Sequence, residues 1–326
     1  MAVLTIGLLW LAFRHVDPRH AWRDIASANP WLLALASGIT IVTYACRAAR
    51  WQAILRPLGG ARFRTAFRTT VIGFTASYLL PARVGEVLKP YLLARQEGLK
   101  PAATFATVVV ERVLDLVVVL VLFAGSLPFL GIDVGAKIKV SGAIAAASAV
   151  AGLGLLFLCA GHPERFARWV TALTRLLPAR IGAATGRLAH VFAEGLVVMR
   201  TPSDLALALA WSVPLWGSIA AGIWVTSRSF DLTMPFAGTF LVVMYLVVGV
   251  SVPTQGGAGG FHLMYQLAVM QFFGATYDRA VAAAFVLYAV SFVPITLLGL
   301  LFMSQDGLTL GGLTKMRQTA EDAEQS

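Results

Sequence analysis

The sequence predicts an all-α, polytopic membrane protein, because the chain is long, strongly apolar and poor in charge. Hydrophobic residues occupy 58% of its 326 positions and charged residues only 13%, whereas soluble domains carry about 25% charged residues. Its mean hydropathy is +0.77. Successive apolar runs with short gaps favour one transmembrane domain over residues 1–303, followed by a polar C-terminal tail over residues 304–326.

The positive charge is concentrated in two regions and sets the expected orientation. Residues 47–100 contain ten Lys/Arg and two Glu, a net charge of +8, and residues 161–202 contain six Arg and two Glu, a net charge of +4. Clustered basic residues between apolar spans are typical of the cytoplasmic side. We therefore interpret 162–200 as a cytoplasmic amphipathic stretch, and we expect no nucleic-acid partner, because topology explains the basic pI.

The chain begins with apolar residues 1–13, which are too few to cross a bilayer alone. After a polar connector, Pro30 opens a span over residues 31–44. This span continues to three residues that we predict to be interface anchors, because aromatic and long basic side chains favour the headgroup region. The predicted anchors are Arg47, Arg50 and Trp51.

The apolar segment 69–80 is short and ends at Pro81, a pattern typical of a re-entrant segment. Non-helical backbone at membrane depth requires a protein or wet surrounding, so Pro81 and Gly85 predict a cavity wall. The next span covers residues 101–124 and carries three charges.

Later spans are predicted over residues 140–160, 204–226, 235–252 and 280–303, with Pro214 as the predicted position of a kink. The sequence breaks this pattern a second time at Pro253, Gly256, Gly257 and Gly259, before a short apolar segment within 258–274. In all we expect about seven or eight spanning helices and two re-entrant or broken segments. Because one break lies in each half, the chain is a candidate for an inverted pseudo-repeat, with a binding site between the halves.

Ionisable residues at membrane depth predict a functional site. Glu111 and Asp115 share a helix face, with Arg112 on its flank. An arginine fork suits a phosphate, so we predict a lipid-headgroup cavity formed by Arg83, Glu86, Glu111, Arg112 and Asp115.

Structural alternatives stand beside each functional interpretation. The charges also suit structural ion pairs that lock helices together, and the glycines also suit close helix packing. His262 is a candidate proton switch or a satisfied interior histidine. Lys89 is expected at the interface.

Four elements of this sequence resemble a known family: Arg47-x-x-Arg50-Trp51, Leu80-Pro81-Ala82-Arg83-x-Gly85-Glu86, Glu111-Arg112-x-x-Asp115 and Pro253-x-x-Gly256-Gly257-x-Gly259. Their order and spacing are similar to those of the transmembrane domain of lysylphosphatidylglycerol synthases and related stand-alone flippase-like proteins, over about positions 10–303. His262 departs from the acid of many relatives, and Gln255 from a common proline.

The resemblance implies a multi-pass protein of the bacterial inner membrane, often a homodimer, that moves or presents phospholipids. The aminoacyltransferase domain of the synthases has no counterpart here, so we expect no enzyme activity. We predict transbilayer movement of a polar lipid, without a cofactor or a metal, since no metal-binding histidine pattern or Walker motif is present. The alternatives are a non-catalytic partner of a lipid or cell-envelope enzyme, and a lipid-modifying enzyme.

Overall fold

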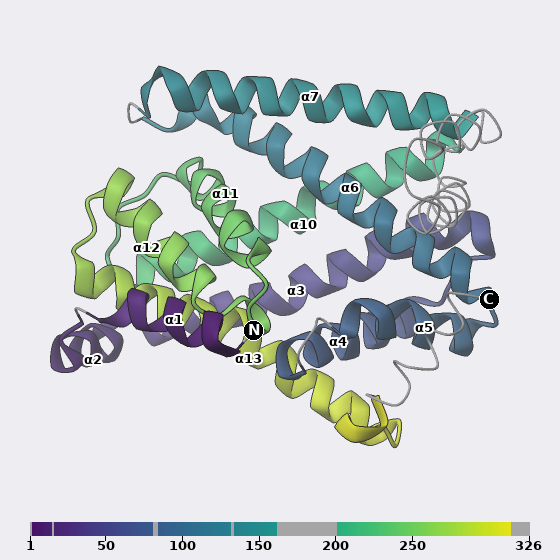
Figure 1. The fold of residues 1–326 in the computed structure, drawn as a ribbon, viewed down its shortest axis with the longest axis horizontal. Helices are drawn as coiled ribbons and strands as arrows, with labels where there is room; N and C mark the ends of the chain where they lie inside the picture. Colours follow the sequence, from purple (N-terminus) through teal and green to yellow (C-terminus); the bar gives the residue numbers. More distant parts are fainter. Residues whose placement is uncertain (1, 15, 81–83, 132–133, 162–200, 314–326) are drawn as a thin grey trace.

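The structure is a computed structural model that describes residues 2–14, 16–80, 84–131, 134–161 and 201–313 (Figure 1). Within these ranges the chain is helical and contains no strand, in agreement with the predicted all-α class. Its α-helices are α1 (Ala2–Phe13), α2 (Pro18–Ser27), α3 (Pro30–Leu55), α4 (Phe63–Leu79), α5 (Gly85–Glu97), α6 (Pro101–Ser126), α7 (Gly135–Gly161), α10 (Pro202–Ser229), α11 (Gly238–Ser251), α12 (Gly260–Phe273) and α13 (Tyr277–Gln305). Short 3-10 helices are η1 (Arg56–Leu58), η3 (Leu127–Phe129) and η5 (Gln255–Gly257).

Among the described residues, three helical segments are long and apolar enough to cross a membrane: Pro30–Leu58, Pro202–Ser229 and Tyr277–Gln305. The first starts sharply because Asn29 caps it, accepting hydrogen bonds from the backbone N–H groups of Trp31 and Leu32 at 3.0 and 3.4 Å, and because proline suits the first helical position. Helix α6 is similarly long, with 26 residues, but it carries three charges. The described chain is therefore a multi-pass membrane helical bundle.

Helices α3 and α10 run side by side through the middle of the bundle (Figure 1). Midway along them, the Thr43 hydroxyl donates a hydrogen bond to Ser218 Oγ at 2.9 Å. Pro214, a predicted kink position, lies inside α10, which the structure assigns as one helix.

Two pairs of short helices form antiparallel hairpins in opposite halves of the molecule (Figure 1). The first hairpin is α4 with α5, and its helices touch where Gly73 meets Gly85 and Lys89. A methyl group on Gly85 would overlap the Gly73 carbonyl oxygen, so this approach requires glycine. The predicted short segment 69–80 is the second part of α4, which begins earlier than expected, at Phe63.

The second hairpin is α11 with α12, and it repeats this design. Its helices approach where Gly249 meets Gly260, and a methyl group on either glycine would overlap the other's backbone. Helix α11 has only 14 residues, so it is shorter than the predicted span over 235–252. The helix begins at Gly238, three residues later than predicted, and Gly238 packs against Phe273 at the open end of the hairpin.

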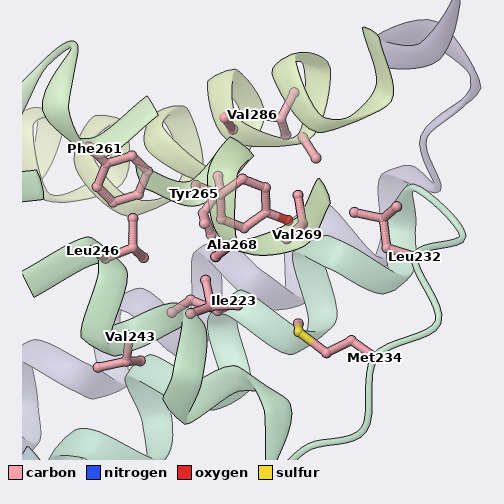
Figure 2. Close-up of a cluster of buried hydrophobic side chains, with 14 of the residues drawn as sticks. Ile223, Leu232, Met234, Val243, Leu246, Phe261, Tyr265, Ala268, Val269 and Val286 are labelled. Carbon is pink, nitrogen blue, oxygen red and sulfur yellow. The ribbon is translucent and has the colours of Figure 1, made fainter. Parts of the chain in front are cut away.

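Apolar packing holds the second hairpin (Figure 2). Phe261, Tyr265 and Val269 of α12 lie in one buried cluster with Val286 of α13 and Ile223 of α10. The Tyr265 hydroxyl, which is buried among them, shares a hydrogen bond of 2.8 Å with Ser227 Oγ. The first hairpin also packs in an apolar cluster, but charged side chains lie beside it.

The predicted amphipathic stretch 162–200 lies outside the described residues, as do residues 314–326 of the predicted tail. The described start of the tail is attached to the bundle, because Leu313 is fully buried in a cluster with Ile72 and Leu88 of the first hairpin.

Candidate functional site: a buried network of ion pairs

Helix α6 carries two carboxylates one turn apart, as the spacing of Glu111 and Asp115 predicts. Both are buried, with 3% and 9% of their surfaces exposed. Arg112 lies on the flank of the same helix, and half of its side chain is exposed. The three charges therefore face other helices to different extents.

Two short ion pairs each hold one oxygen of these carboxylates, while Glu111 Oε1 has no hydrogen-bond partner among the described residues. Arg50 Nη1 of α3 lies 2.5 Å from Asp115 Oδ1, and Lys89 Nζ of α5 lies 2.5 Å from Glu111 Oε2. Arg50 Nη2 also lies 3.7 Å from Glu111 Oε1, so Arg50 bridges both acids. We call Arg50, Lys89, Glu111 and Asp115 the inner network.

The aromatic ring of Trp51 lies against the ammonium group of Lys89. Lys89 Nζ lies 3.9 Å from the centre of the Trp51 ring, a distance at which a cation is attracted to the ring face. Trp51 Nε1 in turn donates to Thr107 Oγ1 of α6 at 2.9 Å. Together with these contacts of Trp51, the inner network joins α3, α5 and α6.

Two further arginines approach the network more loosely. Arg47 Nη1 and Arg112 Nη1 lie 3.9 and 3.7 Å from the same atom, Asp115 Oδ2. Arg112 Nη2 lies 3.7 Å from Glu86 Oε1. These separations exceed hydrogen-bond length, and among the described residues Arg47 Nε has no hydrogen-bond partner. Two guanidinium groups therefore converge on one carboxylate oxygen while keeping donors for another acceptor.

The whole cluster has four cations and three acids, an excess of one positive charge, formed by Arg47, Arg50, Lys89, Arg112, Glu86, Glu111 and Asp115. In chemical terms it suits an anion such as a phosphate, which a planar arginine fork binds through two oxygens. Among the described residues, no group of His, Cys, Asp or Glu is arranged to hold a metal ion.

The prediction of interface anchors is wrong for Arg50 and Trp51, which are fully buried. Arg47 is also mostly enclosed, with 13% of its side chain exposed. The prediction for Lys89 as an interface residue is wrong as well, since it is 6% exposed. All four face α6, whose carboxylates offset the cost of burying a cation.

Other predicted site residues lie beside this cluster or beyond it. Pro81 and Arg83 fall outside the described residues. Glu86 is exposed on the first turn of α5. Gly85 serves the close contact between α4 and α5.

The second break does not join the charged cluster, but it meets the end of α4. Gly256, Gly257 and Gly259 all have positive φ, a backbone region that favours glycine. Gln255 Nε2 donates to the carbonyl oxygen of Leu79 at 3.2 Å, and the Tyr288 hydroxyl donates to the Gly256 carbonyl at 3.1 Å.

His262 is buried at the start of α12 rather than facing the other charges. Its Nδ1 accepts the Gly259 N–H at 3.4 Å, and its ring contacts Phe13, Phe261 and Tyr288 at centroid distances of 4.8–5.9 Å. This environment favours a structural cap.

Aromatic side chains lie between His262 and the charged cluster. Tyr288 stacks on Phe292 at 4.1 Å, and Phe292 contacts Tyr78 at 4.4 Å. The Tyr78 hydroxyl lies 2.5 Å from that of Tyr44, whose ring is 5.9 Å from the Arg47 guanidinium. The sequence offers no periodic signal for this chain of rings, because its members come from three separate helices.

Comparison with known proteins gives one match across nearly the whole chain: residues 1–299 match the family described as the lysylphosphatidylglycerol synthase TM region. Two curated relatives match over shorter stretches. Glycosyltransferase AglD of Haloferax volcanii is 32% identical over 119 residues, which cover 36% of this chain and 19% of AglD. UPF0104 membrane protein MJ1595 of Methanocaldococcus jannaschii is 33% identical over 94 residues, which cover 28% of each chain. No solved structure matches.

Proposed function

Because this chain belongs to the lysylphosphatidylglycerol synthase transmembrane-region family, we propose that it moves a polar lipid, a phospholipid, from one leaflet of the bilayer to the other. In this proposal the headgroup binds at the charged cluster while the acyl chains stay in the hydrocarbon. The protein performs no covalent chemistry on the lipid and requires no cofactor.

The observation that carries this proposal is the contrast between the inner network and the outer arginines. Arg50 and Lys89 each hold a carboxylate at 2.5 Å, although Arg50 keeps Nε and Nη2 without a hydrogen-bond partner, whereas the ion pairs that Arg47 and Arg112 make with the described residues are 3.7–3.9 Å long. A phosphate that replaced these contacts would gain charge-assisted hydrogen bonds. Binding there lowers the high cost of bringing a polar headgroup into hydrocarbon.

We propose further that the two hairpins are re-entrant, one from each side of the membrane. Helices α5, α11 and α12 have only 13 or 14 residues, which is about 20 Å of helix against about 30 Å of hydrocarbon. A re-entrant hairpin adds no crossing, so the long helices that the structure describes, α3, α6, α7, α10 and α13, give five crossings, fewer than the seven or eight expected. The matching glycine contacts support an inverted pseudo-repeat, in which α3–α6 correspond to α10–α13.

The proposed setting is a bacterial-type inner membrane with the basic regions on the cytoplasmic side, and the proposed assembly is a homodimer. Both follow from the family resemblance and the charge distribution rather than from a contact in the structure.

One observation favours the alternative role as a membrane partner of a cell-envelope enzyme. A relative carries the name glycosyltransferase, although the match covers only 19% of its length. In this alternative the cluster joins helices and binds no substrate.

Reconstitution into liposomes separates the two roles. Phospholipids with a fluorescent acyl chain are placed in both leaflets, and an impermeant quencher reports the fraction in the inner leaflet. We expect the protein to speed the loss of protected label, and Arg112→Ala and Glu86→Gln to slow it. Arg23→Ala, an exposed arginine on α2 outside the cluster, is the control.

Each outcome has a distinct meaning if all variants remain folded at equal density. Loss of activity in Arg112→Ala but not in Arg23→Ala supports headgroup binding at the cluster. Equal activity in wild type and Arg112→Ala would refute that site. Absence of any acceleration by the wild type, with anionic and zwitterionic lipids alike, would favour the partner role.

A further inference from the structure

Arg47, one of the two outer arginines, lies against aromatic rings. Its guanidinium carbon is 4.9 Å from the centre of the Phe74 ring of α4 and 5.9 Å from the centre of the Tyr44 ring, three residues earlier on α3. The two rings meet edge to face, with their centroids 5.1 Å apart and an interplanar angle of 89°. Arg47 therefore lies beside two rings at right angles, Tyr44 and Phe74, which we call the aromatic pair.

The aromatic pair is held in place by its own contacts. The Tyr44 hydroxyl shares a hydrogen bond with the Tyr78 hydroxyl of α4. Tyr44 is buried in an apolar cluster with Val71 of α4 and Ile295 of α13, and Phe74 packs against this cluster. Both rings therefore have a fixed position in the protein without bound lipid.

A ring stabilises a cation in a different way from a carboxylate. The ring face attracts the positive charge without accepting a conventional hydrogen bond, whereas a carboxylate binds the N–H groups themselves. Arg50 is an example of the second case, because its Nη1 donates to Asp115 at 2.5 Å. Arg47 Nη1 lies 3.9 Å from the same carboxylate, and the buried Nε of Arg47 has no hydrogen-bond partner among the described residues. The aromatic pair thus stabilises the charge of Arg47 without using its donors.

We infer that Phe74 is a positioning residue of the headgroup site: its ring holds Arg47 away from Asp115, so that the N–H groups of Arg47 stay available for a lipid phosphate. This inference rests on the proposed function and adds the residue that prepares its site. Without the ring, Arg47 would move the remaining distance to Asp115 and form a charge-assisted hydrogen bond. A phosphate would then have to displace that carboxylate, a cost that a preorganised site avoids.

Binding of lipid to the full chain in detergent tests this role. The probe is phosphatidylglycerol with a fluorescent acyl chain, and its fluorescence anisotropy reports the dissociation constant. We expect Phe74→Leu to weaken binding about tenfold, which equals about 1.4 kcal/mol and lies within the range for a cation beside a ring. Phe74→Tyr keeps the ring and should bind within about twofold of the wild type.

The matched control is Phe67→Leu, the same substitution seven residues earlier on α4. Phe67 packs against the same apolar cluster as Phe74, but its ring contacts in the described chain are with Phe63 and Phe302. Phe67→Leu should therefore lose similar packing and keep the lipid affinity of the wild type.

A second variant avoids dependence on the folding of Phe74→Leu. A phenylalanine with fluorine atoms on its ring, incorporated at position 74, keeps nearly the same shape but loses the negative charge of the ring face that attracts a cation. We expect it to weaken binding about threefold or more. A ring that serves packing alone would not respond to this change.

A double-mutant cycle shows whether Phe74 acts through Arg47. Arg47→Ala should weaken binding by itself, because it removes a phosphate ligand. Adding Phe74→Leu to Arg47→Ala should then change the affinity by less than about twofold, since the ring has no guanidinium left to position.

The results separate the two proposals. If Phe74→Leu and the fluorinated ring bind lipid like the wild type while Arg47→Ala does not, the positioning role is wrong and headgroup binding at the cluster stands. If Phe74→Leu weakens binding equally with and without Arg47, or if Phe67→Leu weakens it as much, the loss reports the packing of α4 and the inference is wrong. If the wild type does not bind the lipid, or Arg47→Ala binds it equally well, the proposed role of Arg47 fails, and the positioning role fails with it.

Discussion

The Lys89–Glu111 pair provides a strict test of how the inner network works. We predict that Lys89→Met and Glu111→Leu each destabilise the protein strongly, whereas the double variant recovers most of the lost stability. The reason is that either single change leaves a buried charge without its closest partner. The double change removes both charges and leaves apolar side chains of similar size.

The structure sets the size of each effect. Breaking a buried pair costs about 3–5 kcal/mol. Lys89→Met should fall near about 3 kcal/mol, because Glu111 keeps Arg50 at 3.7 Å. Glu111→Leu should cost nearer about 5 kcal/mol, because the Trp51 ring is then the one close partner of Lys89 that the described residues provide. The double variant should lie within about 1 kcal/mol of the wild type, since Arg50 retains Asp115 at 2.5 Å.

Thermal unfolding in detergent, followed by tryptophan fluorescence, measures the four stabilities of this double-mutant cycle. The transport assay on the double variant adds a second result, because an inner network that only joins helices should leave transport above about half of the wild-type rate. Additive losses in the double variant would refute the reasoning. They would mean that the two side chains do not depend on each other, in spite of their 2.5 Å contact.

Three further predictions concern other parts of the fold. Gly85→Ala should destabilise the protein by about 1–3 kcal/mol or more in the same unfolding assay, because its methyl group would overlap a backbone oxygen of Gly73, while Gly217→Ala, with open space around it, should be neutral. His262→Asn keeps an acceptor for the Gly259 N–H, so we expect its transport rate to keep the pH profile of the wild type; a lost pH dependence would revive the proton switch. At the end of α5, burial acts to raise the pKa of Glu97, but hydrogen bonds from neighbouring hydroxyl and guanidinium groups lower the pKa below its ordinary value of 4.5. Its stabilising effect is therefore complete above pH 4.5 and is lost as the pH falls through the lowered pKa, and Glu97→Gln should remove this part of the acid dependence of unfolding.

The sequence was sufficient to predict a helical membrane bundle with two broken segments, because apolar run length and Pro/Gly breaks are local signals. It also predicted that Glu111 and Asp115 share one face, since the helix period alone decides this. The positions of both breaks also follow from local sequence, because proline and glycine mark each of them.

Local sequence patterns could not predict that the cations Arg50 and Lys89 are buried. Arg50 and Lys89 look like interface residues because each stands in a basic stretch, and their carboxylate partners lie 65 and 22 positions away in the chain. The sequence signal that points to them is the pair of acids on one face of α6, which requires cations from other helices. The hydrogen bond between Gln255 and Leu79 spans 176 positions and has no sequence pattern at all.

The composition of the first hairpin has a consequence for how the protein enters its membrane. Helix α5 has 13 residues and contains Glu86, Lys89, Pro90 and Arg95, so it is too short and too polar to partition into lipid by itself. Its buried lysine is neutralised by Glu111 of α6, which is synthesised later. We therefore expect insertion of α5 to wait until α6 leaves the ribosome, so that the segment from α4 to α6 integrates as one unit and not helix by helix.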